Sequence, residues 1–203
     1  LTAAPPRHLA GATPRERVRT FPVLRDRNGY VRGYVQYMSF DIPLFFRLLF
    51  ARRSDVVLVE PPPTTGAVVR VVCFLRRTPY VYDAADVWSD AADMATGSNL
   101  VIRVLRTIEK FAMRGAAQLV TISQGVVDRV ATLGIHKPIT VTGFGADTSV
   151  FSYQEAPREP LFVYAGSYST WHGAEILVDA LALLHRSGHT ARLRVIGNGE
   201  RDV

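Results

Sequence analysis

The stretch AQLVTISQGVVDRVATLGIHKPITVT, residues 117–142, decides how this chain folds. Its ends, 117–122 and 139–142, are short runs of apolar and β-branched residues, a pattern typical of strands in a sheet that is covered on both faces. Between them, residues 123–133 carry apolar side chains at helical spacing. A strand, a helix and another strand in this order predict a βαβ unit with parallel strands.

The same alternation extends towards the amino terminus. Residues 55–60 form another β-branched run, which the prolines at 61–63 must end because proline cannot continue a strand. The Thr-Thr-Gly at 64–66 suits a helix cap. The remaining expected elements are a loop at 3–19, strands at 18–23 and 79–83, and helices at 37–53, 64–77 and 99–114. We therefore predict an α/β fold built around a parallel sheet.

A composition change after residue 151 indicates a domain boundary. Residues 152–160 are polar and contain two prolines, as linkers often do. A fresh unit follows, with strands expected at 161–165 and 192–196 and a helix at 173–187. We predict a first domain at 1–151, a linker at 152–160 and the start of a second domain at 161–203, too short to close a sheet of its own.

Composition narrows the class of protein. The 203 residues, 48% of them hydrophobic and 21% charged, are typical of a globular protein. The net charge of +6 favours anionic partners, whether nucleotide phosphates, lipid headgroups or nucleic acid. A single cysteine, Cys73 in an apolar stretch, excludes an internal disulfide and a cysteine-built zinc site. No signal peptide or membrane-spanning stretch is apparent, so we expect a cytoplasmic protein.

Ligands of an open parallel sheet bind beyond the carboxyl ends of its strands. There, after the strand at 79–83, residues 83–90 bring Asp83, Asp86 and Asp90 together with Trp88. One of these carboxylates could act as a general base or orient a sugar hydroxyl. Alternatively, Asp86 or Ser89 simply caps a following turn.

The next two strands also end in residues suited to ligands. Ser123 opens the helix at 123–133, where free N–H groups and the helix dipole can hold an anion, although plain N-capping explains it equally well. Gly143 and Gly145 follow the strand at 139–142 and permit a close backbone approach, or form an ordinary glycine turn.

The second unit offers a possible diphosphate site. Its loop from Gly166 to Gly173 includes Ser167 and His172 and could face phosphates with hydroxyls and backbone amides, although a lone histidine is more often structural. The later Gly197-Asn-Gly199 begins a weak GxGxxG match that fails at its sixth position. No GxSxG elbow and no HExxH spacing occurs, which argues against a serine hydrolase or a zinc peptidase of these classes.

The order of these motifs resembles the family 4 glycosyltransferases of the GT-B fold. Residues 79–90, PYVYDAADVWSD, are similar to the family's strand and loop written PfvyDxHDlWPE. The further similar stretches are 119–130, 139–151, 162–173 and 193–199. The resemblance implies two Rossmann-like domains, with the acceptor on the first and a nucleotide-sugar donor mainly on the second. It also implies transfer of the sugar with retention and without a bound metal or other cofactor.

Carried over to this chain, the resemblance makes Asp86 a polar contact to the acceptor or the transferred sugar, with Asp83 beside it; these are the expected catalytic residues. The expected substrate-binding residues are Trp88, Ser123, Gly145, Gly166, Ser167, His172, Gly173, Gly197 and Gly199. The chain departs from the family at Ala85, where many members carry histidine, and lacks a basic residue between 166 and 173. Residues 1–6 resemble the end of the family's second strand. We therefore expect a fragment that lacks the first strand and is inactive by itself.

Two other readings stay open. A nucleotide-sugar epimerase of the GT-B fold would use the same cleft without an acceptor. A non-catalytic basic module would bind membranes or nucleic acid through arginines that lie near the apolar stretch 40–50; these are Arg47, Arg52, Arg53, Arg70, Arg76 and Arg77. No RNA-binding signature is visible, so nucleic acid is not expected. The acceptor of a transferase would be a glycan or a lipid-linked molecule, and peripheral contact with the cytoplasmic face of an anionic membrane is compatible with it.

Overall fold

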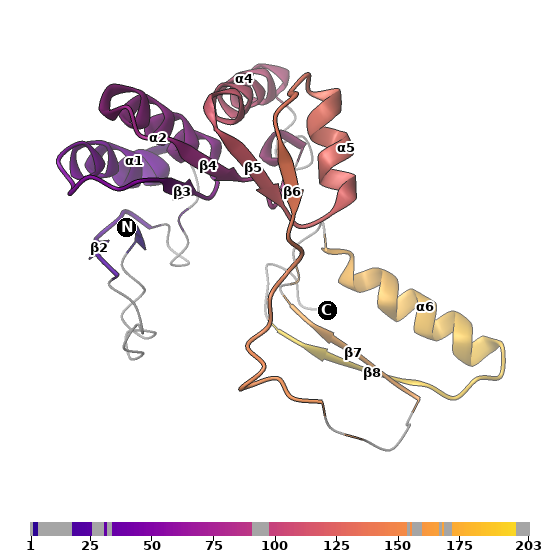
Figure 1. The fold of residues 1–203 in the computed structure, drawn as a ribbon. Coiled ribbons are helices and arrows are strands. Elements are labelled where there is room, and N and C mark those ends of the chain that lie inside the picture. Colours follow the sequence, from indigo (N-terminus) through magenta and orange to yellow (C-terminus); the bar gives the residue numbers. More distant parts are fainter. Residues whose placement is uncertain are drawn as a thin grey trace. The chain divides into compact units, whose positions relative to one another are not determined.

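The computed structural model describes residues 2–3, 18–25, 31, 34–90, 98–153, 155, 160–166, 168 and 172–197. Its internal contacts divide the chain into two compact units, Leu1–Gly145 and Ala146–Val203. Figure 1 shows the ribbon of both.

The first unit is built on a four-stranded parallel sheet. Its strands are β3 (Val57–Val59), β4 (Tyr80–Asp83), β5 (Gln118–Thr121) and β6 (Ile139–Val141), in the spatial order β3-β4-β5-β6. Val59 lies opposite Tyr82, and Tyr82 lies opposite Leu119, so neighbouring strands end close to the same level. The predicted α/β class with a parallel sheet is confirmed.

Helix α1 (Tyr34–Leu49) precedes β3 in the chain. Helices α2 (Pro63–Arg76), α4 (Asn99–Gly115) and α5 (Gln124–Thr132) connect the successive strands. Figure 1 shows α1, α2 and α4 side by side, and α2 contacts both of its neighbours. Gly66 permits the close approach of α2, because a Cβ there would lie 2.6 Å from the Tyr82 ring and 2.9 Å from Ala112 Cβ.

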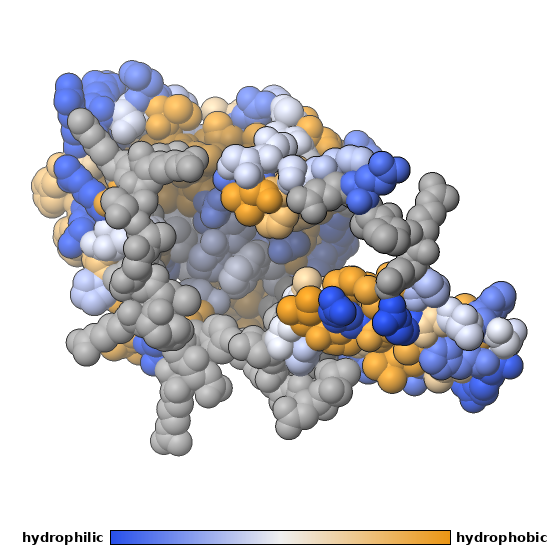
Figure 2. Space-filling view, turned by 90° about the horizontal axis from the view of Figure 1, so that it is seen from below, coloured by the Kyte–Doolittle hydropathy of each residue, from blue (hydrophilic) through white to orange (hydrophobic). Residues whose placement is uncertain are grey.

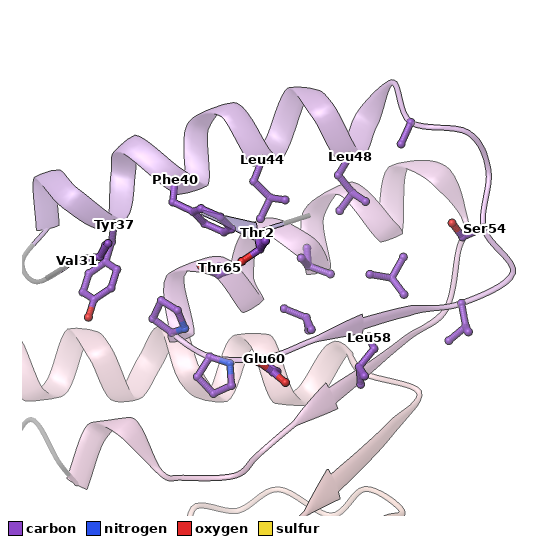
Figure 3. A pocket seen from close by; sticks show the side chains of 17 residues that line it. Thr2, Val31, Tyr37, Phe40, Leu44, Leu48, Ser54, Leu58, Glu60 and Thr65 are labelled. Atoms are coloured by element: carbon purple, nitrogen blue, oxygen red, sulfur yellow. The ribbon is translucent and has the colours of Figure 1, made fainter. Parts of the chain in front are cut away.

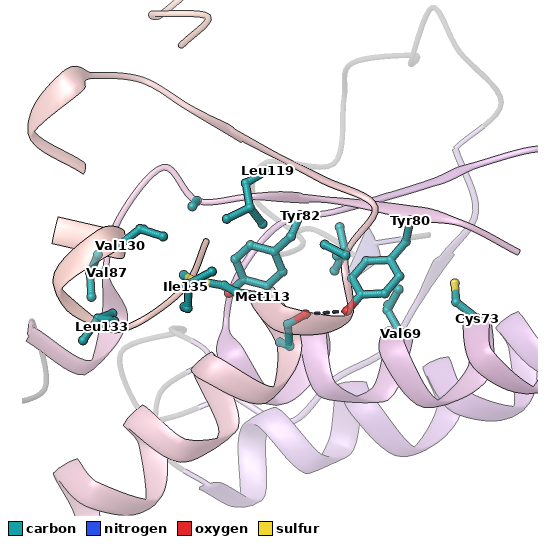
Figure 4. Close-up of a cluster of buried hydrophobic side chains, with 14 of the residues drawn as sticks. Val69, Cys73, Tyr80, Tyr82, Val87, Met113, Leu119, Val130, Leu133 and Ile135 are labelled. Carbon is teal, nitrogen blue, oxygen red and sulfur yellow. Dashed lines mark hydrogen bonds between the residues drawn. The ribbon is translucent and has the colours of Figure 1, made fainter. Parts of the chain in front are cut away.

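The core of this unit lies between the helices and one face of the sheet. Tyr82, Met113 and Leu119 are fully buried and meet there, as Figure 4 shows. Tyr80 also points into the core, two positions before Tyr82 on β4, and its hydroxyl donates a hydrogen bond to the Ala112 carbonyl. Alternate residues of a strand share one face, which explains why the two tyrosines lie together.

The amino-terminal segment forms a separate pair of short strands. β1 (Thr2–Ala3) pairs in parallel with β2 (Thr20–Phe21), so the predicted strand at 18–23 is two residues long in the structure. Phe21 is buried and stacks on Phe40 of α1, with ring centroids 5.0 Å apart. A pocket of about 660 Å³ lies along β3, with Phe40, Leu44 and Leu48 of α1 and Thr2 of β1 in its lining (Figure 3).

The start of α2 differs from the sequence-based expectation. The helix begins at Pro63, after an N-cap at Pro62 in the extended conformation, and no side chain caps it. Proline suits the first helical position because the backbone N–H that it lacks would have no partner within the helix. Thr65, expected in the cap, instead turns inward and donates a hydrogen bond of 2.6 Å to the Asp41 carboxylate.

The second unit is smaller. β7 (Leu161–Ala165) and β8 (Arg192–Ile196) are parallel and in full register, and α6 (Ala174–Arg186) connects them. The two strands have the bounds that the sequence predicts, and the helix is one residue shorter at each end than predicted. Within the described residues of this unit, only Ala174 is a buried apolar residue. Phe162 and Ile176 are exposed, and the space-filling view in Figure 2 shows apolar residues on the molecular surface.

Candidate functional site

The carboxyl ends of β3, β4, β5 and β6 share one edge of the first sheet, because the four strands are parallel. The loop after β4 is fixed to β5 at this edge by two hydrogen bonds of 2.8 Å. The Ala84 N–H donates to the Val120 carbonyl, and Thr121 Oγ1 donates to the Ala84 carbonyl. Both Ala84 and Thr121 are buried. The loop that carries the predicted catalytic residues therefore starts from a rigid point.

The two predicted catalytic carboxylates have different surroundings. Asp83, the last residue of β4, is half-buried, and burial raises the pKa of its carboxyl above the ordinary value. Asp86 is exposed at the tip of the loop. Since an exposed carboxylate at this edge can reach a ligand directly, Asp86 suits a hydrogen bond to a hydroxyl group.

A buried carboxylate that sequence reasoning missed holds the next part of the loop. Residues 88–90 are helical, and Glu109 of α4 accepts hydrogen bonds from the N–H groups of Trp88 at 2.7 Å and Ser89 at 3.3 Å. These N–H groups at the start of a helical turn have no partner within the turn. The Glu109 side chain is fully buried, and this burial raises the pKa of its carboxyl.

The third carboxylate of the loop is an anchor. Asp90 accepts two hydrogen bonds of 2.6 Å from Arg129 of α5, and the Arg106 guanidinium lies 3.7 Å away. These hydrogen bonds from Arg129 hold the pKa of Asp90 below its ordinary value. Because Asp90 is engaged in this way, the carboxylates available to a ligand in this loop are those of Asp83 and Asp86.

Trp88 adds an aromatic surface beside these carboxylates. The indole is half-buried and meets the ring of Tyr37 edge to face, with centroids 6.1 Å apart. Tyr37 lies near the start of α1. In the chain, β3, α2 and β4 separate it from Trp88. No local pattern marks it, and sequence reasoning missed it for that reason.

The ends of β5 and β6 leave backbone open to solvent at the same edge. Ser123 is exposed at the N-cap of α5 and makes no side-chain capping hydrogen bond, so N-capping does not explain it. Gly143 has φ of 68°, a conformation that favours glycine. A Cβ placed on Gly143 or Gly145 would meet no atom within 4 Å. A ligand can therefore approach the backbone here.

In the second unit, the predicted glycines adopt conformations suited to close backbone contact. The Gly166 N–H donates a hydrogen bond of 3.0 Å to the Ile196 carbonyl. A Cβ on Gly197, whose φ is 152°, would lie 1.8 Å from the Gly166 carbonyl oxygen. Gly173 has φ of 62° at the start of α6, directly after the exposed His172. Ser167 and Gly199 lie outside the described residues.

In the part of the chain that the structure describes, no three or more His, Cys, Asp or Glu side chains gather closely enough to hold a metal ion. No described helix is both long and apolar enough to cross a membrane. The ligand-contacting roles of the residues above stay predictions.

Comparison with known proteins identifies the family. A family model described as a glycosyl transferase 4-like domain matches residues 1–145. No curated protein sequence matches the chain. Among solved structures, it is similar to the crystal structure of Arabidopsis thaliana UGT89C1 complexed with UDP-L-rhamnose, with a TM-score of 0.53 and 15% sequence identity. That match covers 91% of this chain and 55% of the other, so the chain spans little more than half of that protein.

The structural likeness shows the fold, which is of the predicted GT-B type with Rossmann-like units. The family match rests on the sequence and includes the whole of the unit that holds Asp83, Asp86 and Trp88. Because it extends over 145 of the 203 residues, this chain belongs to the family of glycosyl transferase 4-like domains.

Proposed function

We propose that this chain is part of a glycosyltransferase that moves a sugar from a nucleotide-sugar donor to a glycan or lipid-linked acceptor, with retention of configuration. The observation that carries the proposal is the loop at 83–90, which lies at the carboxyl edge of the sheet in a chain of this family. The crystallised UGT89C1 holds UDP-L-rhamnose, which supports a nucleotide-sugar as the donor.

On the acceptor side, Asp86 is the proposed contact to a sugar hydroxyl. Its carboxylate is exposed, while the loop beneath it is held by Thr121 and Glu109. Rigid support matters because a group that positions a substrate must itself be fixed. Trp88 offers an apolar surface beside Asp86, and sugar rings present apolar faces to such side chains.

On the donor side, the second unit would bind the diphosphate. Gly166, Gly173 and Gly197 are the proposed donor-side glycines, and the N–H groups at the start of α6, which begins at Ala174, would face an anion. Ser167, His172 and Gly199 would complete this side. No bound metal is required in the proposal, since backbone N–H groups and the helix dipole can stabilise the negative charge.

The test uses the whole protein that contains this chain, because we infer that turnover requires both complete domains. The protein is incubated with individual nucleotide-sugars and candidate acceptors, and transfer is followed by mass spectrometry. Asp86→Asn should lower the transfer rate on the order of a hundredfold, as expected for loss of a general base or an orienting carboxylate. The matched control is Asp55→Asn, an exposed aspartate just before β3, at the opposite edge of the sheet.

If the Asp86→Asn variant transfers sugar at the rate of the parent, Asp86 does not take part in the site. Conversion of a nucleotide-sugar to its epimer without any acceptor would instead favour an epimerase and overturn the proposal. Retention is checked in the same reaction by the anomeric configuration of the product in NMR spectra.

A further inference from the structure

Helix α1 is apolar on two opposite faces. Phe40, Leu44 and Leu48 point towards β3 and line the pocket in Figure 3. A surface helix normally carries polar residues on the side away from the core, but α1 does not. The residues of this α1 outer face, with the exposed fraction of each, are Val35 (64%), Met38 (54%), Ile42 (50%), Phe46 (55%) and, directly after the helix, Phe50 (80%).

These residues form one continuous stripe. They follow one another at intervals of three or four positions, the spacing of a single helix face. With a rise of 1.5 Å per residue, the stripe is about 22 Å long. Helix α2 widens it, because Val68 joins Met38, Ile42 and Phe46 in lining a groove of about 390 Å³. Phe74, further along α2, is 81% exposed.

The exposed charges at the end of the α1 outer face are mainly basic. Within α1, the one acidic residue is Asp41, which is buried and accepts the hydrogen bond from Thr65. The first exposed acid after the helix is Asp55. Arg52 and Arg53 are exposed directly beyond the helix, and Arg77 is exposed at the end of α2. An apolar stripe that ends in exposed arginines suits a surface that is apolar within and anionic outside.

We propose that the α1 outer face docks on an anionic lipid bilayer, with the helix lying in the plane of the interface and the arginines on the headgroups. A second copy of the same face fits less well, since its one exposed acid at this end, Asp55, would meet two exposed arginines, Arg52 and Arg53. Helix α1 also supplies Tyr37, which contacts Trp88 at the candidate site. Docking would therefore bring the acceptor side close to the membrane, and this consequence rests on the proposed function.

The test measures binding of the 203-residue chain to sedimented vesicles. Vesicles of equimolar phosphatidylcholine and phosphatidylglycerol should bind the chain at low salt and release it at high salt, whereas phosphatidylcholine vesicles should bind it weakly. The variant Met38→Ser/Ile42→Ser/Phe46→Ser should lower the partition coefficient at least about tenfold. The matched control changes three exposed apolar residues of α6, Ile176→Ser/Val178→Ser/Leu183→Ser, and should bind as the parent does.

A second pair of variants tests the charges without altering the apolar face. Arg52→Gln/Arg53→Gln should reduce binding on the order of tenfold, because each arginine near an anionic surface strengthens binding several-fold. Arg103→Gln/Arg186→Gln removes the same charge from exposed positions on α4 and α6 and should have little effect. Circular dichroism verifies that all four variants keep the helix content of the parent chain.

Equal binding to neutral and anionic vesicles, or equal losses in the α1 and α6 triple variants, would overturn the proposal. So would analytical ultracentrifugation showing that the α1 triple variant abolishes self-association while vesicle binding persists. Vesicle binding needs neither donor nor acceptor, so its failure leaves the proposed transferase standing. Failure of transfer with intact vesicle binding would count against the transferase alone.

Discussion

The carboxylate of Glu109 lies beneath the loop that carries the candidate site and accepts hydrogen bonds from the N–H groups of Trp88 and Ser89. A carboxyl group buried in this way holds its proton more tightly than it does in the unfolded chain. The same side chain therefore positions the loop and makes the stability of the protein depend on pH.

Glu109→Gln should remove this pH dependence. Burial raises the pKa of Glu109 above its ordinary value of 4.5, so its favourable contribution to folding is fully present below pH 4.5. That contribution is lost as the pH rises through the raised pKa. The free energy of unfolding of the parent, measured in urea between about pH 4 and pH 8, should fall relative to that of the variant. A constant difference across this range would contradict the assignment.

Helix α1 shows how a tertiary contact sets the end of an element. The pattern predicts a helix to residue 53, but α1 ends at Leu49. The guanidinium of Arg76 on α2 donates hydrogen bonds to the carbonyls of Leu49 and Ala51, the latter at 2.8 Å. The last carbonyl groups of a helix need partners outside it, and Arg76 provides them.

Arg76→Met should loosen this end of α1. We expect the free energy of unfolding to fall by about 1–2 kcal/mol, because carbonyl groups lose a charged donor while the apolar stem of the side chain is kept. Arg53→Met, at an exposed position, is the control and should change stability by less than about 0.5 kcal/mol. Chemical denaturation followed by circular dichroism measures both, and equal effects would argue against the capping role.

The elements that the sequence predicts well are those with strong local patterns. The run at 118–121 is a strand in the structure because its apolar and β-branched residues meet the demands of a covered sheet. The run at 161–165 also forms a strand, although Phe162 and Val163 on it are exposed. The position of Asp83, Asp86 and Trp88 at the carboxyl edge follows from that strand pattern alone. Glu109, Arg129 and Tyr37 could not be predicted, because each reaches the loop from a distant helix and no local spacing records that contact.

The two units differ greatly in what they bury. The first contains Tyr82, Met113, Leu119 and many other fully buried side chains. In the described part of the second, Ala174 is the one apolar residue that is buried. Apolar burial is the main favourable contribution to folding, so the stabilities of the two units should differ in the same direction.

Hydrogen exchange should reveal this difference. Amides of β4 and β5 should exchange at least about a hundredfold more slowly than those of β7 and β8, although all four strands are parallel and hydrogen-bonded. Exchange followed by mass spectrometry on peptides from each unit provides the measurement. Equal protection in both units would show that the second is stabilised by something other than its own buried side chains.

Strand β3 lies at one edge of its sheet. Leu58 on this strand is 63% exposed, and Val56, directly before the strand, is 53% exposed. An edge strand with apolar side chains is a template on which other chains can add strands. We therefore expect the isolated chain to associate more readily as its concentration rises. The protein concentration should therefore be varied in each transfer and binding assay. A loss of activity or binding at high concentration would indicate that chains add to β3, and would say nothing about the chemistry of the site.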